Sequence, residues 1–385
     1  MITQLKFKNW RSLRDVTIDN LQPINVFIGA NASGKSNIIN GLRFWQQSSS
    51  SGGYISTLIQ WGGRKELCNY NSDQKSFEFD FSYIPRLQDD PVTQHYRVDF
   101  DLNNEKFALS DNLVVAGIMY DFTRLQKVMT LTSDLSYAWN IHKYTGRFIE
   151  IRWQILMEGF LPGLQSIQTD TPIINPYLIH SRANNLATQL EYLQQVHPTQ
   201  FEQLIEDTRW LLPQVTDVDV ERHQNELQVM LEEKFWKERK ILSISAGTGR
   251  ILAMLLPFFL LDADERDNQV SIFDFDRFFM PCNQMPGVVI IEEPDTALNP
   301  HLLGRFVELV RSYVEDAEYP RQVIFTTHNP SFLDYFQPEE VRVVERDEQG
   351  DTIVNTIPDY IKEIWLDKHT LGEVWMTRAI GGTPK

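Results

Sequence analysis

The feature that most constrains the fold is a glycine-rich loop between a short apolar strand and an apolar-periodic helix. The strand is expected over Ile24–Ile28, and the loop Gly29–Ser36 reads G-x-x-x-x-G-K-S. Such a loop curls tightly, so that its N–H groups and the positive end of the following helix face a phosphate. Lys35 would neutralise the β- and γ-phosphates, and Ser36 would ligate Mg²⁺. The sequence therefore predicts a nucleoside triphosphate site.

The two ends of the chain predict a mixed α/β core. Short strands are expected near the start, and the last third alternates helices with buried strands, which is typical of a sheet with parallel strands covered by helices. The expected strands are Ile2–Phe7, Val16–Ile18, Val288–Ile291, Gln322–Thr326 and Val341–Glu345, and the expected helices are Gly249–Leu261 and Pro300–Val314.

The middle of the chain has a different pattern. From about 75 to 160, apolar and polar residues alternate, as in Phe77, Phe79 and Phe81, which predicts an antiparallel sheet with one buried face. Residues 185–213 are expected to be helical and to precede a pair of strands. The remaining stretches are expected to be loops: Ser48–Gly53 from its Ser and Gly content, and Asp262–Pro286 as an insertion without periodicity.

Two carboxylates follow the buried strand Val288–Ile291. At the C-terminal end of such a strand, side chains reach the ligand crevice of an α/β sheet. Glu292 could hold Mg²⁺ directly or through water, and Glu293 could polarise an attacking water molecule. The alternative is a charged strand end without a chemical role.

A histidine and a serine–glycine helix start complete the set of candidate residues. His328 follows the strand Gln322–Thr326 and could hydrogen-bond a γ-phosphate, although a histidine here can also be structural. Ser245 and Gly247 precede an expected helix, where a hydroxyl and free N–H groups can meet a phosphate. Taken alone, this segment is better explained as a helix cap.

Composition limits the partners. The 385 residues carry a net charge of −16, with 36 Lys and Arg against 52 Asp and Glu, which argues against a broad, non-specific nucleic-acid surface. A local basic groove could still form where two subunits meet. Cys68 and Cys282 are expected to be reduced thiols. No signal peptide or membrane span is recognisable, so no membrane association is expected and the expected compartment is the cytoplasm.

In this order, the four elements resemble those of the ABC-type ATPases, within the branch of SMC, RecF and OLD-like proteins. A transporter subunit would place its double carboxylate nearer the phosphate loop, and a small-molecule kinase would lack the serine–glycine and histidine elements. The residues that carry the resemblance are Gly29–Asn37, Ser245–Thr248, Ile291–Pro294, Thr296–Pro300 and Thr326–Pro330, with weaker similarity at Leu5–Leu13, Leu371–Trp375 and Gly381–Gly382.

The resemblance implies an ABC-type ATPase head with a P-loop, a mixed β-sheet core, an antiparallel β lobe and a helical and β insertion. The halves of the head would be residues 1–110 and 241–385, and the insertion 111–240. ATP and Mg²⁺ are the implied cofactors, sandwiched between two copies of the chain or between the chain and a related partner. The implied nucleotide-binding residues are Arg11, Gly29, Asn31, Ser33, Gly34, Lys35, Ser36, Asn37, Ser245 and Gly247; the implied catalytic residues are Glu293 and His328, and the implied metal ligands are Ser36 and Glu292.

Three residues depart from the family pattern. Glu292 stands where Asp is usual, Ala246 replaces a Gly or Asp, and Asn299 stands where close relatives carry His. We therefore expect slow hydrolysis, in a switch that gates dimerisation. One hypothesis is a sensor of DNA or RNA in anti-phage defence, working with a nuclease or toxin from another chain, since no nuclease domain is recognisable here. The alternatives are a DNA-repair or chromosome-maintenance ATPase and a non-hydrolysing scaffold.

Overall fold

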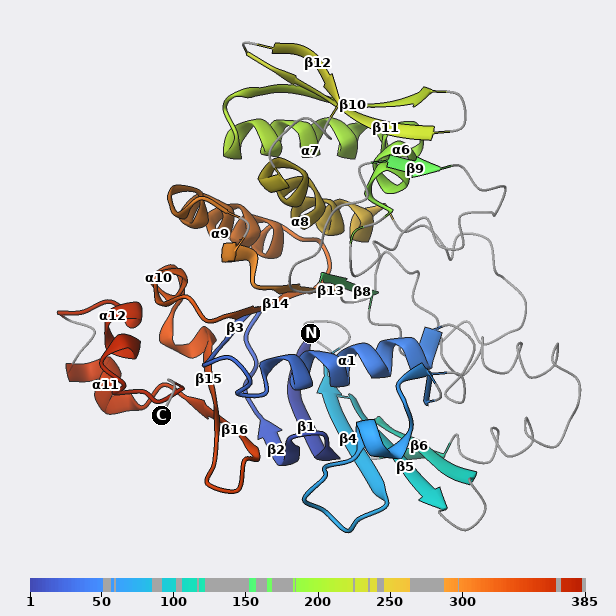
Figure 1. The fold of residues 1–385 in the computed structure, drawn as a ribbon, viewed down its shortest axis with the longest axis vertical. Coiled ribbons are helices and arrows are strands. Elements are labelled where there is room, and N and C mark those ends of the chain that lie inside the picture. Colours follow the sequence, from blue (N-terminus) through green and yellow to red (C-terminus); the bar gives the residue numbers. More distant parts are fainter. Residues whose placement is uncertain are drawn as a thin grey trace, which may run out of the picture. The chain divides into compact units, whose positions relative to one another are not determined.

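The computed structural model describes residues 1–50, 57–58, 60–84, 92–101, 106–115, 118–121, 152–156, 165–167, 183, 185–223, 226–234, 236–240, 246–263, 287–296, 298–364 and 368–382. These residues form two compact units, whose elements are labelled in Figure 1. The first unit comprises the described residues within Met1–Ile151 and Phe336–Lys385. The second comprises those within Arg152–Asp274 and Met280–Tyr335.

The first unit contains the expected antiparallel sheet over residues 76–121, but the expectation is wrong for Arg152–Leu156, which pairs in parallel with another strand in the second unit. The strand order of the antiparallel sheet is β2-β1-β4-β5-β6-β7, and every neighbouring pair is antiparallel. Phe77, Phe79 and Phe81 are buried, whereas Glu78 and Asp80 between them are partly exposed, so the period-two prediction is confirmed. The strands are β1 (Ile2–Trp10), β2 (Leu13–Ile18), β4 (Ser76–Tyr83), β5 (Val92–Asp101), β6 (Lys106–Val115) and β7 (Ile118–Asp121).

Helix α1 (Lys35–Ser50) begins at the glycine loop and packs on this sheet, as Figure 1 shows. Its Phe44 meets Trp10 and Phe77 at ring-centroid distances of 5.2 and 5.5 Å. These edge-on and tilted contacts form an aromatic core between α1 and the sheet. The helix includes Ser48–Ser50, so the prediction of a loop from residue 48 is wrong there; helical hydrogen bonding from the preceding turns overrides the weak preference of serine.

A second group of strands in the first unit carries the glycine loop. Strand β3 (Ile24–Ile28) is fully buried and lies parallel to β15 (Val341–Arg346), and β15 pairs antiparallel with β16 (Thr352–Thr356). The shorter helices α3 (Arg64–Leu67), α11 (Asp359–Ile364) and α12 (Leu371–Met376) and the 3₁₀ turn η4 (Pro338–Glu340) also belong to this unit. The expected strands Ile24–Ile28 and Val341–Glu345 are thus found within one residue of their expected ends.

The second unit contains three parallel strands in the order β14-β13-β8. Every residue of β13 (Gly287–Glu292) and β14 (Arg321–Thr327) is buried, as expected for strands covered on both faces. Helices α8 (Ala246–Asp262) and α9 (Pro300–Glu315) pack on them. The expected helices and strands are confirmed within three residues at each end; β8 (Arg152–Leu156), η3 (Pro294–Thr296) and α10 (Pro330–Leu333) complete the group.

A smaller sheet covers helices in the second unit. Strand β10 (Val215–His223) pairs with β11 (Glu226–Glu233), which also pairs with β12 (Trp236–Lys240) and β9 (Gln165–Ile167). The helical region expected over 185–213 is confirmed and consists of two helices, α6 (Leu186–Val196) and α7 (Pro198–Leu211). The helices are separate because Pro198 lacks the N–H that a continuous helix would need at that position. Proline is tolerated in the first turn of a helix, where α7 places it.

Some expectations fall outside the described residues. These are the start of the serine–glycine segment, including Ser245, most of the insertion expected over Asp262–Pro286, and Cys282. Within the described part of the chain, no helix combines the length and the apolar character needed to cross a bilayer.

Candidate functional site

The phosphate loop leaves β3 along a path that only glycine can follow at two positions. A Cβ on Gly29 would lie 2.1 Å from the carbonyl oxygen of Val344, so the backbone of β15 occupies that space. Gly34 has φ +118°, and its Cβ would lie 2.0 Å from Oγ1 of Thr352. The two motif glycines are therefore required by close packing as well as by the turn of the loop.

Lys35 is buried within this loop. Its Nζ donates hydrogen bonds to the carbonyl oxygens of Gly29, at 2.7 Å, and of Ala30, at 3.0 Å. The Ser33 hydroxyl is also buried and has no hydrogen-bond partner among the described residues. A buried cation and an unsatisfied hydroxyl in one loop fit the oxygens of a phosphate. Asn31 and Ser36 of the same loop are exposed, which leaves them accessible to a ligand.

Side chains from three distant parts of the first unit hold the loop. Asn37 Nδ2 donates to Ser12 Oγ at 2.6 Å, and Ser12 Oγ lies 2.7 Å from Thr352 Oγ1. Thr352 Oγ1 in turn donates to the carbonyl oxygen of Ser33 at 3.0 Å. Sequence reasoning missed Ser12 and Thr352 because neither belongs to a phosphate-binding motif. Their separation of 340 residues gives no local signal either.

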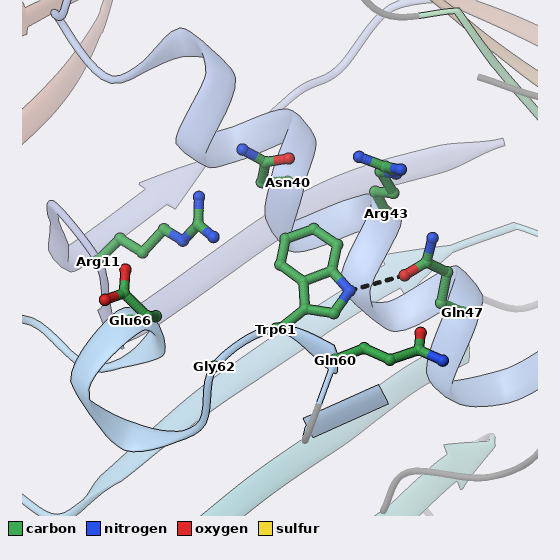
Figure 2. Close-up of a pocket in the computed structure, with 8 residues that line it drawn as sticks. All are labelled: Arg11, Asn40, Arg43, Gln47, Gln60, Trp61, Gly62 and Glu66. Carbon is green, nitrogen blue, oxygen red and sulfur yellow. Dashed lines mark hydrogen bonds between the residues drawn. The ribbon is translucent and has the colours of Figure 1, made fainter. Parts of the chain in front are cut away.

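Arg11 lies beside this network and lines a cavity of about 600 Å³ (Figure 2). Its guanidinium lies 5.3 Å from the ring centroid of Trp61, and the guanidinium of Arg43 lies 5.6 Å from the same ring, both within cation–π range. Trp61 is oriented by its Nε1, which donates to Gln47 at 2.7 Å. The amides of Asn40 and Gln60, together with Gly62 and Glu66, complete the lining.

The charge of Arg11 is partly shielded from water. Burial lowers the pKa of its guanidinium from the ordinary value, and the carboxylate of Glu66 acts in the opposite direction. Its Nε is buried without a hydrogen-bond partner among the described residues. Since arginine keeps its proton at neutral pH, this cavity presents a cation next to a flat aromatic ring.

The double carboxylate ends β13 in the second unit. Glu292 pairs in register with Thr326 of β14, and Glu293 has φ +49°, a left-handed conformation that strains a residue with a side chain. Its N–H donates to the carbonyl oxygen of Thr326 at 2.9 Å. Nδ1 of His328 lies 2.9 Å from Oε1 of Glu293. The structure therefore brings the predicted catalytic residues Glu293 and His328 together at the ends of adjacent strands.

Further polar residues fix this acidic strand end. Oγ1 of Thr327 donates to Oδ1 of Asp295 at 2.9 Å and accepts from the N–H of Asn329 at 3.0 Å. Asn299, one of the departures from the family pattern, caps α9: its side chain accepts from the N–H of His301 at 3.1 Å. Asp295 and Thr327 could have been singled out by their place at the strand ends, but short polar residues are common there.

The remaining predicted residues divide between the two units. Ser36 lies in the first unit, and Glu292 lies in the second. Among the described residues, no group of three or more His, Cys, Asp or Glu side chains could hold a metal ion. A hydroxyl, a carboxylate and phosphate oxygens nevertheless suit Mg²⁺, which keeps several waters. Gly247 lies in the first turn of α8.

Two family models match separate parts of the chain. Residues 1–145 match a model described as "AAA ATPase domain". Residues 169–334 match one described as "AAA domain, putative AbiEii toxin, Type IV TA system". The two matches contain the phosphate loop and the double carboxylate, respectively.

Similar proteins add the fold and a more specific relationship. An OLD nuclease of Thermus scotoductus is 31% identical over 113 residues, a match that spans 29% of this chain and only 19% of that protein. Two solved SMC head domains match 94% and 95% of this chain, and 99% and 98% of their own, at TM-scores of 0.55 and 0.53. One is bound to the C-winged helix domain of ScpA; the other, from Pyrococcus furiosus, has an extended coiled coil and is bound to the C-terminal domain of ScpA. At 14% and 13% identity these two show the fold alone. Together, the family matches, the OLD relative and the fold support an ABC-type ATPase of the SMC, RecF and OLD type.

Proposed function

We propose that this protein binds Mg·ATP, hydrolyses it slowly and uses it to gate dimerisation. The observation that carries this proposal is the phosphate loop of the first unit, in which the ammonium group of Lys35 is buried against the loop's own carbonyl oxygens. An ammonium group in this loop can pair with the oxygens of a triphosphate, and charge-assisted hydrogen bonds to phosphate are strong. The fold is that of SMC head domains.

The loop residues divide the work of nucleotide binding. Lys35 would leave the carbonyl oxygens of the resting loop and pair with the β- and γ-phosphates, and the glycines would let backbone N–H groups approach them. Ser36, with Glu292, would hold Mg²⁺, which supplies charge neutralisation of the phosphates. Arg11 would add a cation at the nucleotide. The remaining proposed contacts are Asn31, Ser33 and Asn37.

Glu293 is the proposed general base for hydrolysis. Its carboxylate is largely buried, at 7% exposure, and lies at hydrogen-bond distance from His328, so both groups can be ordered before a water molecule arrives. His328 would orient Glu293 and contact the γ-phosphate. The left-handed backbone at Glu293 fixes the direction of its side chain further.

Dimerisation follows from the single set of motifs. In our proposal, Ser245 and Gly247 of one copy, or of a related chain, face the γ-phosphate held by Lys35 of the other. Residues 1–110 and 241–385 would supply the two halves of each head, with 111–240 as the insertion. Hydrolysis would then release the two heads, and a dimer would accumulate whenever hydrolysis is slow.

For the biological role, we favour anti-phage defence in the cytoplasm, with a nuclease or toxin supplied by another chain and DNA or RNA as the signal. This choice is supported by the family description that names AbiEii toxin and type IV toxin–antitoxin systems and by the OLD nuclease relative. The second candidate role is chromosome maintenance or DNA repair, which is suggested by the similarity of the fold to SMC head domains. Co-purification of native complexes would distinguish the two by the proteins and nucleic acid recovered.

The nucleotide site is tested by Lys35→Ala with Mg·ATP in an equilibrium titration. Loss of a charge-assisted contact to phosphate is expected to weaken binding about 100-fold. Lys234→Ala, which removes an exposed lysine of the second unit, is the matched control and is expected to bind as the wild type does. Wild-type affinity in the Lys35 variant would refute the site. A non-hydrolysing scaffold would bind ATP and dimerise without releasing phosphate.

A further inference from the structure

A two-glycine segment that follows α12 lies against the start of the phosphate loop. The carbonyl oxygen of Gly382 accepts a hydrogen bond of 2.7 Å from the N–H of Ala30. A Cβ built on Gly382 would lie 3.6 Å from Cα of Gly29, so the two backbones are in close contact. In the sequence, Gly381 and Gly382 show only a weak similarity to the family pattern, and that similarity predicts no role for them.

The bond from Ala30 acts on the same peptide group that holds Lys35. The peptide between Gly29 and Ala30 offers its N–H to Gly382 on one side and its C=O to Nζ of Lys35, at 2.7 Å, on the other. Because a peptide group is planar, fixing the N–H also fixes the direction of the C=O. Hydrogen bonds at the two ends of one amide also polarise and strengthen each other.

Gly382 is held in turn by groups that leave little freedom. Its N–H donates to Oε2 of Glu345 at 3.1 Å, at the end of β15. It has φ +71°, and a Cβ here would lie 2.7 Å from Cγ1 of Val343 and 3.2 Å from Nε1 of Trp375. Val343 and Trp375 are themselves buried. A side chain at residue 382 would therefore have to displace either the core or the loop.

We propose that Gly382 is a positioning residue for the phosphate loop: it orients the Gly29–Ala30 peptide and so sets the loop geometry that receives the triphosphate. The inference rests on the proposed ATP site at Lys35. Gly382 itself touches no phosphate in this proposal. Gly382 acts by fixing the orientation of the Gly29–Ala30 peptide, whose carbonyl oxygen accepts the Lys35 hydrogen bond before nucleotide binds. It also fixes the backbone where the chain enters the loop.

The test is Gly382→Ala in the full chain, compared with Gly350→Ala. Gly350 has a similar φ of +84°, but a Cβ there meets only the hydroxyl of Tyr70, at 3.6 Å. Both variants incur the left-handed strain of alanine, and only the first places a Cβ against the buried residues beside the loop. We expect Gly382→Ala to weaken Mg·ATP binding about tenfold or more, because the new side chain would shift the loop and a misplacement of about 1 Å at a binding site is costly. Gly350→Ala should lower Tm and leave the Kd near that of the wild type.

A second pair of variants avoids backbone strain. Glu345→Ala removes the acceptor of the Gly382 N–H. The control is Asn355→Ala, which removes an exposed hydrogen bond of 3.1 Å from Asn355 Nδ2 to Oε1 of Glu345 and leaves the acceptor of Gly382 in place. Weaker ATP binding is expected for Glu345→Ala alone. In hydrogen exchange, the amide of Ala30 should lose protection in Gly382→Ala and Glu345→Ala and keep it in the two controls.

The outcomes separate this inference from the proposed function. If the wild type binds Mg·ATP, Lys35→Ala does not, and Gly382→Ala binds as tightly as Gly350→Ala, then the positioning role is refuted and the ATP site stands. If the wild type fails to bind Mg·ATP at all, the proposed function itself is refuted. If Tm falls equally in both glycine variants while only Gly382→Ala loses affinity, the positioning role is supported.

Discussion

The phosphate loop of the first unit and the acidic strand end of the second are both polar and buried, but they are held in different ways. Hydrogen bonds around the loop join residues 340 and 319 positions apart, through Ser12, Ser33 and Thr352. Around Glu293, the contacts with His328, and of Thr327 with Asp295, span 35 and 32 positions. These shorter contacts join the ends of two adjacent parallel strands.

Because the hydrogen bonds of the two regions differ in sequence separation, the geometry of each region depends on different parts of the chain. The loop geometry depends on strands and turns from both ends of the chain, so substitutions far from its motif should change nucleotide binding. The acidic end depends on β13, β14 and the turns that follow them, so its function should respond mainly to its own residues. Three predictions test this contrast, beginning with the largest effect.

Glu293→Gln should remove hydrolysis while leaving the first unit intact. The amide cannot accept a proton from water, and loss of a general base lowers the rate by roughly 100-fold to 10⁴-fold. Phosphate release would be measured together with ATP affinity and with size-exclusion chromatography in ATP. We expect retained binding and accumulation of an ATP-bound dimer, the opposite of Lys35→Ala, which should lose both.

Glu308→Gln is the control for this variant, since Glu308 is an exposed glutamate of α9 in the same unit. It should hydrolyse and dissociate as the wild type does. A Glu293 variant that hydrolyses at the wild-type rate would show that another group activates the water. One that remains monomeric in ATP would count against the sandwich.

Thr352→Val should destabilise the first unit and weaken nucleotide binding, although residue 352 lies far from the motif in the sequence. Valine keeps the shape but leaves the carbonyl of Ser33 without its donor in a buried site, at a cost of about 1–3 kcal/mol in unfolding free energy. Denaturant unfolding and an ATP titration measure the two effects. Thr356→Val makes the same change at an exposed position of the same strand and should stay within about 0.5 kcal/mol.

Equal stability and affinity in the Thr352 and Thr356 variants would remove the contrast between the two regions. It would mean that the loop holds its shape without the long-range network. A loss of stability without a loss of affinity would place Thr352 in the fold of the first unit only.

Asn299→Ala should have the smallest effect and act on the second unit. Loss of the α9 cap is expected to cost about 1 kcal/mol, because the first N–H groups of the helix lose an acceptor. Asn299→Asp keeps an accepting oxygen and should retain most of that stability. Unfolding in urea measures the difference, and ATP affinity serves as a check that the phosphate loop is unchanged. If alanine and aspartate are equally stable, the cap contributes nothing.

Most of the elements near the candidate site could be predicted from sequence because the local pattern determined them. The glycines of the loop, the apolar run before Glu292 and the strand before His328 each combine a period with a boundary residue. Where local signals compete, a prediction was wrong: serine content favours a loop at Ser48–Ser50, which the end of α1 occupies. The helical pattern of 185–213 is confirmed, but it does not by itself show the division into two helices at Pro198.

The supporting contacts could not be predicted for a physical reason. Ser12, Thr352 and Gly382 are common residue types in turns and strands. Thr352 reaches the loop because β16, which contains it, pairs with β15, and β15 pairs with β3. Such pairings depend on tertiary packing, which one sequence does not display. Asn299 departs from the family pattern in sequence, and the structure gives it a local role as the cap of α9.

The union of both chain ends in the first unit has a consequence for biosynthesis. Ser12 leaves the ribosome 340 residues ahead of Thr352, an interval of roughly 20–70 s at ordinary elongation rates. Throughout that interval β3 has no β15 beside it, whereas Trp10, Phe44 and Phe77 of the aromatic core have all been synthesised early. The phosphate loop should therefore reach its final geometry only after translation of the last strands, and we expect nucleotide to be captured only after that point.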